Sequence, residues 1–147
     1  MFLQLSITEL SEGLRAKKFS VADLVSECYE RIEKYEERIH SFITLIDKKE
    51  ALVLAEKQQK LLSSSSSPLA GIPFVMKDAY LTEGILTTAA SKVLSDFIPP
   101  YSATVYERLL ASGAILIGKM NMDAWGHGGS TENTDYGPTK NPWDRTR

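Results

Sequence analysis

The chain has 147 residues, of which 43% are hydrophobic and 24% are charged, and this composition is typical of a single globular domain. Its formal net charge of −2 argues against a protein that coats nucleic acid, because such proteins carry a strong basic excess. A lone cysteine, Cys28, excludes an internal disulfide, and two histidines are too few for a zinc site. Neither a secretory signal nor a membrane-spanning run is evident, so we expect a cytoplasmic protein.

Two helices are predicted in the first 40 residues. Ser6 and Glu9 form a capping-box pattern ahead of apolar residues at helical spacing, which predicts a short first helix. From Ser20 to Ile39, apolar residues recur every three or four positions with charged residues between them. This spacing predicts an amphipathic helix with a solvated outer side.

A short strand and a third helix are predicted next, followed by an abrupt change of composition. Residues 42–46 are β-prone, and Asp47 marks the start of another helix. Five serines and a proline at residues 63–68 are interpreted as a flexible linker, since nothing in the run favours one hydroxyl as a nucleophile. The predicted organisation is a helical N-terminal segment over residues 1–62, a Ser-rich linker over residues 63–69, and an α/β core over residues 70–147.

Beyond the linker, strand and helix patterns alternate. Residues 72–76 form a continuous apolar run, typical of a strand buried on both faces, and residues 114–118 predict a second such strand. Between them, residues 102–111 have helical spacing, and Gly113 stands where a C-terminal helix cap belongs. Strand, helix and strand make a βαβ unit, which builds a parallel sheet with functional loops at the carboxyl ends of its strands.

Each of these strands is followed by a lysine, Lys77 or Lys119. A lysine behind an apolar run can be drawn into a low-dielectric site, where desolvation disfavours its charged form and makes it a usable base. A neutral lysine can then activate a neighbouring hydroxyl as a nucleophile. The alternative is a lysine that reaches water, beside Asp78 in the case of Lys77. For Lys119 the solvated state is the expectation.

The C-terminal stretch from residue 126 has almost no apolar periodicity and predicts an extended loop. Gly128 and Gly129, followed by Ser130, would let the backbone approach a ligand closely. The glycine spacing matches neither a phosphate-binding P-loop nor a dinucleotide-binding turn, so the residues by themselves indicate only a flexible loop. Asp123, just ahead of this stretch, is expected to cap a short turn.

Five blocks of the chain resemble the amidase-signature family, in the order in which that family carries them. The blocks are residues 71–78 (GIPFVMKD), 87–91 (TTAAS), 119–123 (KMNMD), 130–133 (STEN) and 136–144 (YGPTKNPWD). The resemblance runs from about residue 5 to residue 147, and an ordered set of blocks is far more specific than any one motif. It implies the start of an α/β/α sandwich with a mixed central sheet, preceded by a helical segment.

The resemblance also implies an amide-hydrolysing enzyme whose catalytic group is a lysine, a bridging serine and a nucleophilic serine. The family's lysine matches Lys77, and the loop of Gly128, Gly129 and Ser130 is expected to lie near the substrate. Both serines are expected in a Gly/Ser-rich block after Arg147, so this chain by itself is expected to be inactive. Ala90 stands where the family commonly has a glycine.

Within the family, residues 121–123 and 130–133 favour the tRNA-dependent amidotransferases over general amidases. That branch implies glutamine as substrate and ammonia passed to the partner B and C subunits, with tRNA bound through a partner. For this chain no metal, cofactor or membrane is implied, while the complex uses ATP and magnesium. Two alternatives stay open: a general amidase of small amides, and a non-catalytic truncated chain that binds partners through its amphipathic helices.

Overall fold

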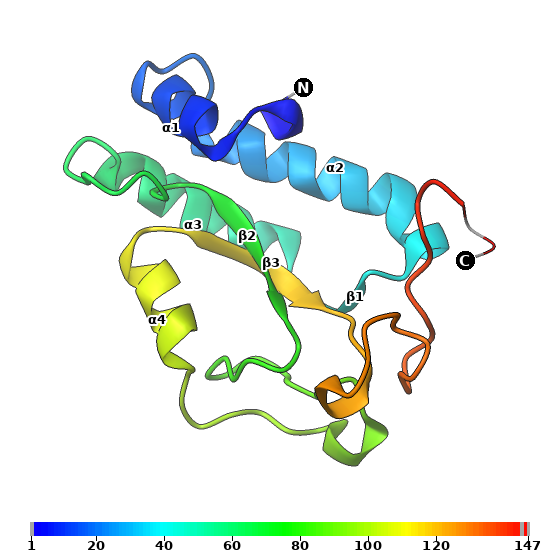
Figure 1. Cartoon of the computed structure of the whole chain (residues 1–147). Helices are drawn as coiled ribbons and strands as arrows, with labels where there is room; N and C mark the ends of the chain where they lie inside the picture. Colours follow the sequence, from blue (N-terminus) through cyan, green and yellow to red (C-terminus); the bar gives the residue numbers. More distant parts are fainter. Residues whose placement is uncertain (1, 145, 147) are drawn as a thin grey trace. The chain divides into compact units, whose positions relative to one another are not determined.

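The computed structural model describes residues 2–144 and 146 and combines helices with a small sheet (Figure 1). The α-helices are α1 Ile7–Arg15, α2 Val21–Ile39, α3 Lys48–Leu61 and α4 Thr104–Ala111. The strands are β1 Phe42–Leu45, β2 Pro73–Lys77 and β3 Ile115–Met120. Short 3-10 turns are η1 Phe2–Gln4, η2 Lys92–Leu94 and η3 Ala124–Gly126. Within the described residues, no helix is long and apolar enough to cross a membrane.

The sheet is mixed, as predicted for this fold class. Its strand order is β1-β3-β2, and β1 pairs with β3 in the antiparallel direction. On the other side of β3, the amide of Ile115 donates to Ile72 at 3.0 Å, and the amide of Asp78 donates to Met120 at 3.1 Å. The first bond joins the start of β2 to the start of β3, and the second joins the ends of the two strands. The strands β2 and β3 are therefore parallel. Helix α4 connects them, which confirms the βαβ unit.

The chain divides into two compact units that are interleaved in sequence. The first comprises Met1–Glu33, Ile46–Phe74 and Arg108–Ile117, and the second comprises Lys34–Leu45, Val75–Glu107 and Gly118–Arg147. Both β2 and β3 contribute residues to each unit. The candidate site described below lies entirely within the second unit.

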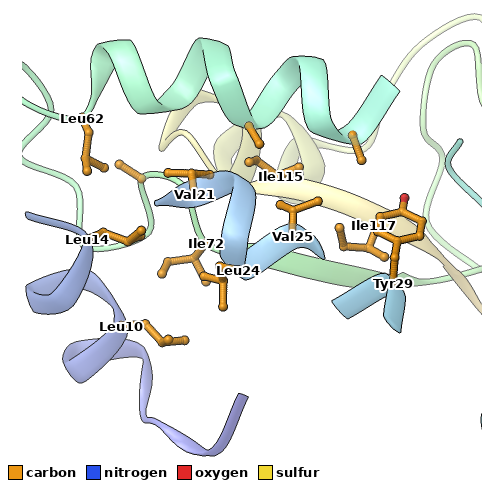
Figure 2. Packing of buried hydrophobic residues seen from close by; sticks show 13 residues of the cluster. Leu10, Leu14, Val21, Leu24, Val25, Tyr29, Leu62, Ile72, Ile115 and Ile117 are labelled. Atoms are coloured by element: carbon orange, nitrogen blue, oxygen red, sulfur yellow. The ribbon is translucent and has the colours of Figure 1, made fainter. Parts of the chain in front are cut away.

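The core of the first unit is built where the helices α1, α2 and α3 meet the beginnings of β2 and β3 (Figure 2). Leu14, Leu24 and Val25 have no exposed surface, and they pack in one cluster with Ile72 and Ile117. The apolar stripes predicted from helical spacing therefore face this core in part, whereas Ile7 at the start of α1 is 53% exposed and Tyr35 of α2 is 39% exposed. The predicted capping box at the start of α1 is also present, because the Ser6 and Glu9 side chains each accept the other's backbone amide.

The Ser-rich segment lies inside the first unit and does not separate two units. The guanidinium of Arg15 donates to the carbonyl oxygens of Ser65 and Ser67, each at 2.8 Å. The amides of Ser64 and Ser65 both donate to the carbonyl of Leu61. The run is thus a turn held by α1 and by the end of α3, where the sequence had indicated a flexible linker. Composition did not reveal the Arg15 contacts because they join residues about 50 positions apart.

The two strands of the βαβ unit differ in burial. Residues Ile115 to Lys119 of β3 are all buried, which confirms that this strand is covered on both faces. By contrast, only Met76 is buried within β2, and the side chain of Val75 is 42% exposed. The expectation of a doubly covered strand was therefore wrong for β2. The apolar run correctly predicted a strand. The burial of the two faces of that strand, however, depends on which segments pack over them.

Replacing Gly118 with alanine is expected to weaken the pairing of β1 with β3. A Cβ atom at this position would lie 2.6 Å from the carbonyl oxygen of Thr44 and 2.9 Å from the Phe42 ring. We expect a loss of about 1–3 kcal/mol in the free energy of unfolding, the usual cost of overpacking a buried site, measured by urea denaturation. Gly129→Ala is the matched control, because nothing lies within 4 Å of its Cβ. Equal stability of the two variants would contradict the prediction.

Candidate active site

Lys77 ends β2 and extends into solvent. Its neighbours Met76 and Asp78 are buried while Lys77 is exposed, as the alternation of side chains along a strand requires. The desolvated environment expected for this lysine is therefore not present around Lys77 in this chain. Its catalytic role stays a prediction. Lys77 does lie at the carboxyl end of a parallel strand, which is where α/β sheets carry their binding and reactive groups.

Lys119, unlike Lys77, is buried, so the expectation of a solvated lysine at this strand end was wrong. Its side chain has no exposed surface, although it lies near the end of β3. The ammonium donates to the carbonyl of Tyr80 at 2.9 Å and to the hydroxyls of Thr82 and Thr87 at 3.0 and 2.6 Å. Burial lowers the pKa of Lys119, and the charge of Asp78 opposes that shift. Of the two lysines singled out from the sequence, the buried one is Lys119.

Asp78 is the charge partner of Lys119 and is itself fully buried. Its Oδ1 atom lies 3.3 Å from the Lys119 ammonium and, among residues 2–144 and 146, accepts no hydrogen bond. Its Oδ2 atom accepts from the amide of Thr88 at 2.9 Å and from the Thr88 hydroxyl at 2.6 Å. The carboxylate thus joins the end of β2, the end of β3 and the segment that contains Thr88.

A second buried carboxylate, that of Asp123, holds the glycine-rich loop. Its Oδ2 atom accepts from the amides of Ser130 and Thr131 at 2.9 and 3.0 Å, and its Oδ1 atom accepts from the amide of Asn133 at 3.0 Å. Asp123 does precede the turn η3, but its side chain makes no cap hydrogen bond there. The expected capping role was therefore wrong: the side chain closes a loop seven to ten residues further along the chain.

Asp123 also connects this loop to Lys77. The three amide donors, with that of Thr131 the largest cause, hold the pKa of Asp123 below its usual value, and the positive charge of Lys77 acts in the same direction. Lys77 is therefore within electrostatic reach of the carboxylate that shapes the loop. Asp123, a residue given no site role in the sequence analysis, thus holds Ser130 by a hydrogen bond and feels the charge of Lys77, the two residues that the resemblance assigned to one site.

The members of the predicted substrate-binding loop differ in their surroundings. A Cβ on Gly128 would lie 2.6 Å from the Asp123 carboxyl carbon, so only glycine fits beside the carboxylate. Gly129 has open space around it. Ser130 lines an open pocket of about 910 Å³ together with Glu132, Lys140 and Trp143. Within the described part of the chain, no three His, Cys, Asp or Glu side chains are arranged to hold a metal.

The segment opposite this loop contains two alanines in a left-handed conformation. Ala89 and Ala90 have φ values of 50° and 57°. The amide of Ala89 donates to the carbonyl of Asp78, and the carbonyl of Ala89 accepts from the amide of Trp125 in η3. Glycine, which the resemblance leads us to expect at position 90, would adopt this backbone without the Cβ penalty. With alanine at both positions the turn is strained, and its hydrogen bonds hold its shape.

Replacing Asp123 with asparagine is expected to lower the melting temperature at pH 7 by several degrees. All three amide donors lose their charged acceptor, and at least one of them faces an NH2 group that cannot accept. The folded-state pKa of Asp123 is lowered, so the carboxylate stabilises the fold above its unfolded pKa of about 3.9. That contribution is lost as pH falls through the lower folded-state pKa. Thermal unfolding at pH 7 and pH 2 measures the effect, and the gap between wild type and variant should shrink in acid. Asp96→Asn, an exposed aspartate, is the control; a gap unchanged by pH would contradict the assignment.

Comparison with known proteins identifies the family. The family model described as Amidase matches residues 23–147, and the chain belongs to this family. The A subunit of glutamyl-tRNA(Gln) amidotransferase from Desulfatibacillum aliphaticivorans is 44% identical over 145 residues, which are 98% of this chain and 30% of that protein. The chain spans about 30% of the length of the curated relatives that it matches.

Solved structures agree with this assignment. A protein described with a vestigial complex that reveals the origins of an s-triazine catabolic enzyme has a TM-score of 0.89 and 32% identity, covering 97% of this chain and 32% of its own. The A subunit of glutamyl-tRNA(Gln) amidotransferase from Thermotoga maritima has a TM-score of 0.76 and 28% identity, covering 100% of this chain and 29% of its own. The fold therefore corresponds to about 30% of an amidase-family chain.

Proposed function

We propose that this sequence forms the first part of the glutamine-hydrolysing subunit of a tRNA-dependent amidotransferase, which converts Glu-tRNA(Gln) to Gln-tRNA(Gln). The observation that carries the proposal is the 44% identity, across 98% of this chain, with a protein named as the A subunit of glutamyl-tRNA(Gln) amidotransferase. Two further observations support it: Lys77 ends a parallel strand, and Asp123, which binds the amide of Ser130, is influenced by the charge of Lys77. In this proposal Lys77 is the general base and Gly128, Gly129 and Ser130 contact the substrate.

The proposed reaction has two steps, in which two serines of the longer protein act with Lys77. Lys77 takes a proton, relayed by a bridging serine, from the nucleophilic serine, whose oxygen attacks the side-chain amide carbon of glutamine. The relayed proton passes to the departing nitrogen, and ammonia is released. The glutamyl group stays bound to the nucleophilic serine as an ester. Water then hydrolyses the ester and frees glutamate and the serine hydroxyl. The resemblance puts these serines in a block other than the five in this chain, so we propose that the 147-residue chain alone is inactive.

The proposed partners follow from the same relatives. The B and C subunits would receive the ammonia and bind tRNA, and their ATP- and magnesium-dependent step would activate the glutamyl-tRNA. In this chain, no residue is proposed to bind a cofactor. The proposed setting is the cytoplasm, where translation takes place.

Ammonia release from glutamine tests the proposal. The full-length protein should be co-expressed with the B and C subunits, and ammonia measured with and without ATP and Glu-tRNA(Gln). We expect glutamine hydrolysis that rises when the tRNA substrate is present. Hydrolysis of small amides by the protein without partners, with no response to tRNA, would favour a general amidase instead. Partner binding without any amide hydrolysis would favour the non-catalytic alternative.

A further inference from the structure

Lys119 is a buried charge for which the proposed reaction has no use. Its side chain has no exposed surface, and four oxygens lie within 3.3 Å of its ammonium. Burying an ammonium is costly, and replacing a buried ion pair with apolar residues of similar volume is often neutral or stabilising. The stability of the fold is thus a weak reason for this arrangement. A second reason lies in its partner Asp78, which directly follows the candidate base in the chain.

The ion pair fixes the residue that follows Lys77. The amide of Asp78 donates to Met120 at 3.1 Å, and its carbonyl accepts from Ala89 at 3.2 Å. Its carboxylate is held by Thr88 on one oxygen and by Lys119 on the other. Every polar atom of residue 78 is therefore engaged. Because adjacent side chains of a strand point to opposite faces, a fixed and buried Asp78 directs Lys77 to the opposite, solvent-facing side.

The same ammonium fixes the segment that runs on from Asp78. Its bonds to the carbonyl of Tyr80 and to the hydroxyls of Thr82 and Thr87 hold both sides of this segment against β3. The segment then reaches Ala89, whose carbonyl accepts from the amide of Trp125 at 3.0 Å. Trp125 lies two residues beyond Asp123, the carboxylate within reach of Lys77. One buried charge thus connects Lys77 with the turn that carries Asp123.

We propose that Lys119 and Asp78 are positioning residues, which hold Lys77 at a fixed distance and direction from the loop of Asp123 and Ser130. The inference rests on the proposed function of Lys77 as the base. Neither residue touches the substrate in this proposal. Their loss should therefore lower kcat and leave KM for glutamine nearly unchanged.

The test uses the full-length protein with its B and C subunits, and compares Lys119→Met with the double variant Asp78→Asn/Lys119→Met. The single variant leaves a buried unpaired carboxylate, so its melting temperature and its kcat should both fall. The double variant removes both charges, so it should regain most of the melting temperature. Its kcat should still be about 10²-fold below wild type, the cost of a misplaced reacting group, with KM within about twofold. The exposed Lys57→Met is the control.

A double variant with wild-type kcat and regained stability would overturn the inference and leave the pair a purely structural one. If the double variant does not fold, Thr87→Val replaces it, because this change of similar shape removes the 2.6 Å bond to the ammonium and keeps both charges. It also removes the weaker contacts of this hydroxyl with the carbonyl of Ile85 at 3.1 Å and the hydroxyl of Thr82 at 3.2 Å. It should lower kcat about tenfold with KM unchanged, and a wild-type kcat would again overturn the inference. Failure of the proposed function is separate: it would show as no glutamine hydrolysis by wild type, or as full activity of Lys77→Ala.

Discussion

Lys77→Ala in the full-length protein is expected to lower kcat for glutamine hydrolysis by about 10²–10⁴-fold, the usual contribution of a general base. The lysine lies at the carboxyl end of β2, within electrostatic reach of Asp123, and in the proposed mechanism it is the group that takes the serine proton. Because the side chain is exposed, the melting temperature should stay close to that of wild type. Ammonia release under saturating glutamine and thermal unfolding measure the two quantities.

Lys77→Arg separates the charge of this residue from its role as a base. A guanidinium keeps the positive charge near Asp123 but stays protonated, so it cannot accept the serine proton. We expect this variant to be as inactive as Lys77→Ala. Lys57→Ala, at an exposed lysine of α3, should keep wild-type activity. Activity retained by both Lys77 variants would exclude this lysine as the base and, with it, the proposed mechanism.

Lys119→Met is expected to lower the free energy of unfolding by about 3–5 kcal/mol, the range measured when one partner of a buried ion pair is removed. The methionine fills similar space but leaves the Oδ1 atom of Asp78 without its only charge partner among the described residues. The hydroxyl of Thr87 also loses a 2.6 Å donor. Urea denaturation of the chain at pH 7 measures the effect.

The double variant tests the cause of this destabilisation. With Asp78→Asn added to Lys119→Met, neither charge of the pair stays buried, so most of the lost stability should return. Lys57→Met makes the same chemical change at an exposed site and should alter stability by less than about 0.5 kcal/mol. If Lys119→Met proves as stable as Lys57→Met, the carboxylate of Asp78 must be protonated or hydrated in the variant. The pair of Asp78 and Lys119 would then not hold the end of β2 as described.

Local signals in the sequence determined most of the secondary structure. The capping box of Ser6 and Glu9, the apolar stripe of α2 and the run that forms β3 all appear where they were predicted. Each depends on residues within a few positions of one another, so sequence spacing is enough to reveal it. The five ordered blocks likewise identified the family, because a short motif keeps its residues together in the sequence. The strand β1 was predicted as an element, but its antiparallel pairing with β3 was not.

Only the tertiary structure decided which charged residues are buried and what they hold. Lys77 and Lys119 each follow an apolar run, yet one is exposed and the other has no exposed surface. The difference arises because the segment of Tyr80, Thr82 and Thr87 covers the Lys119 ammonium. Lys77 ends β2 on the face opposite the buried Asp78. Asp123 likewise acts on amides seven to ten residues away. Burial and long-range hydrogen bonds depend on which segments pack together in the folded chain. The spacing of neighbouring residues in the sequence does not show this.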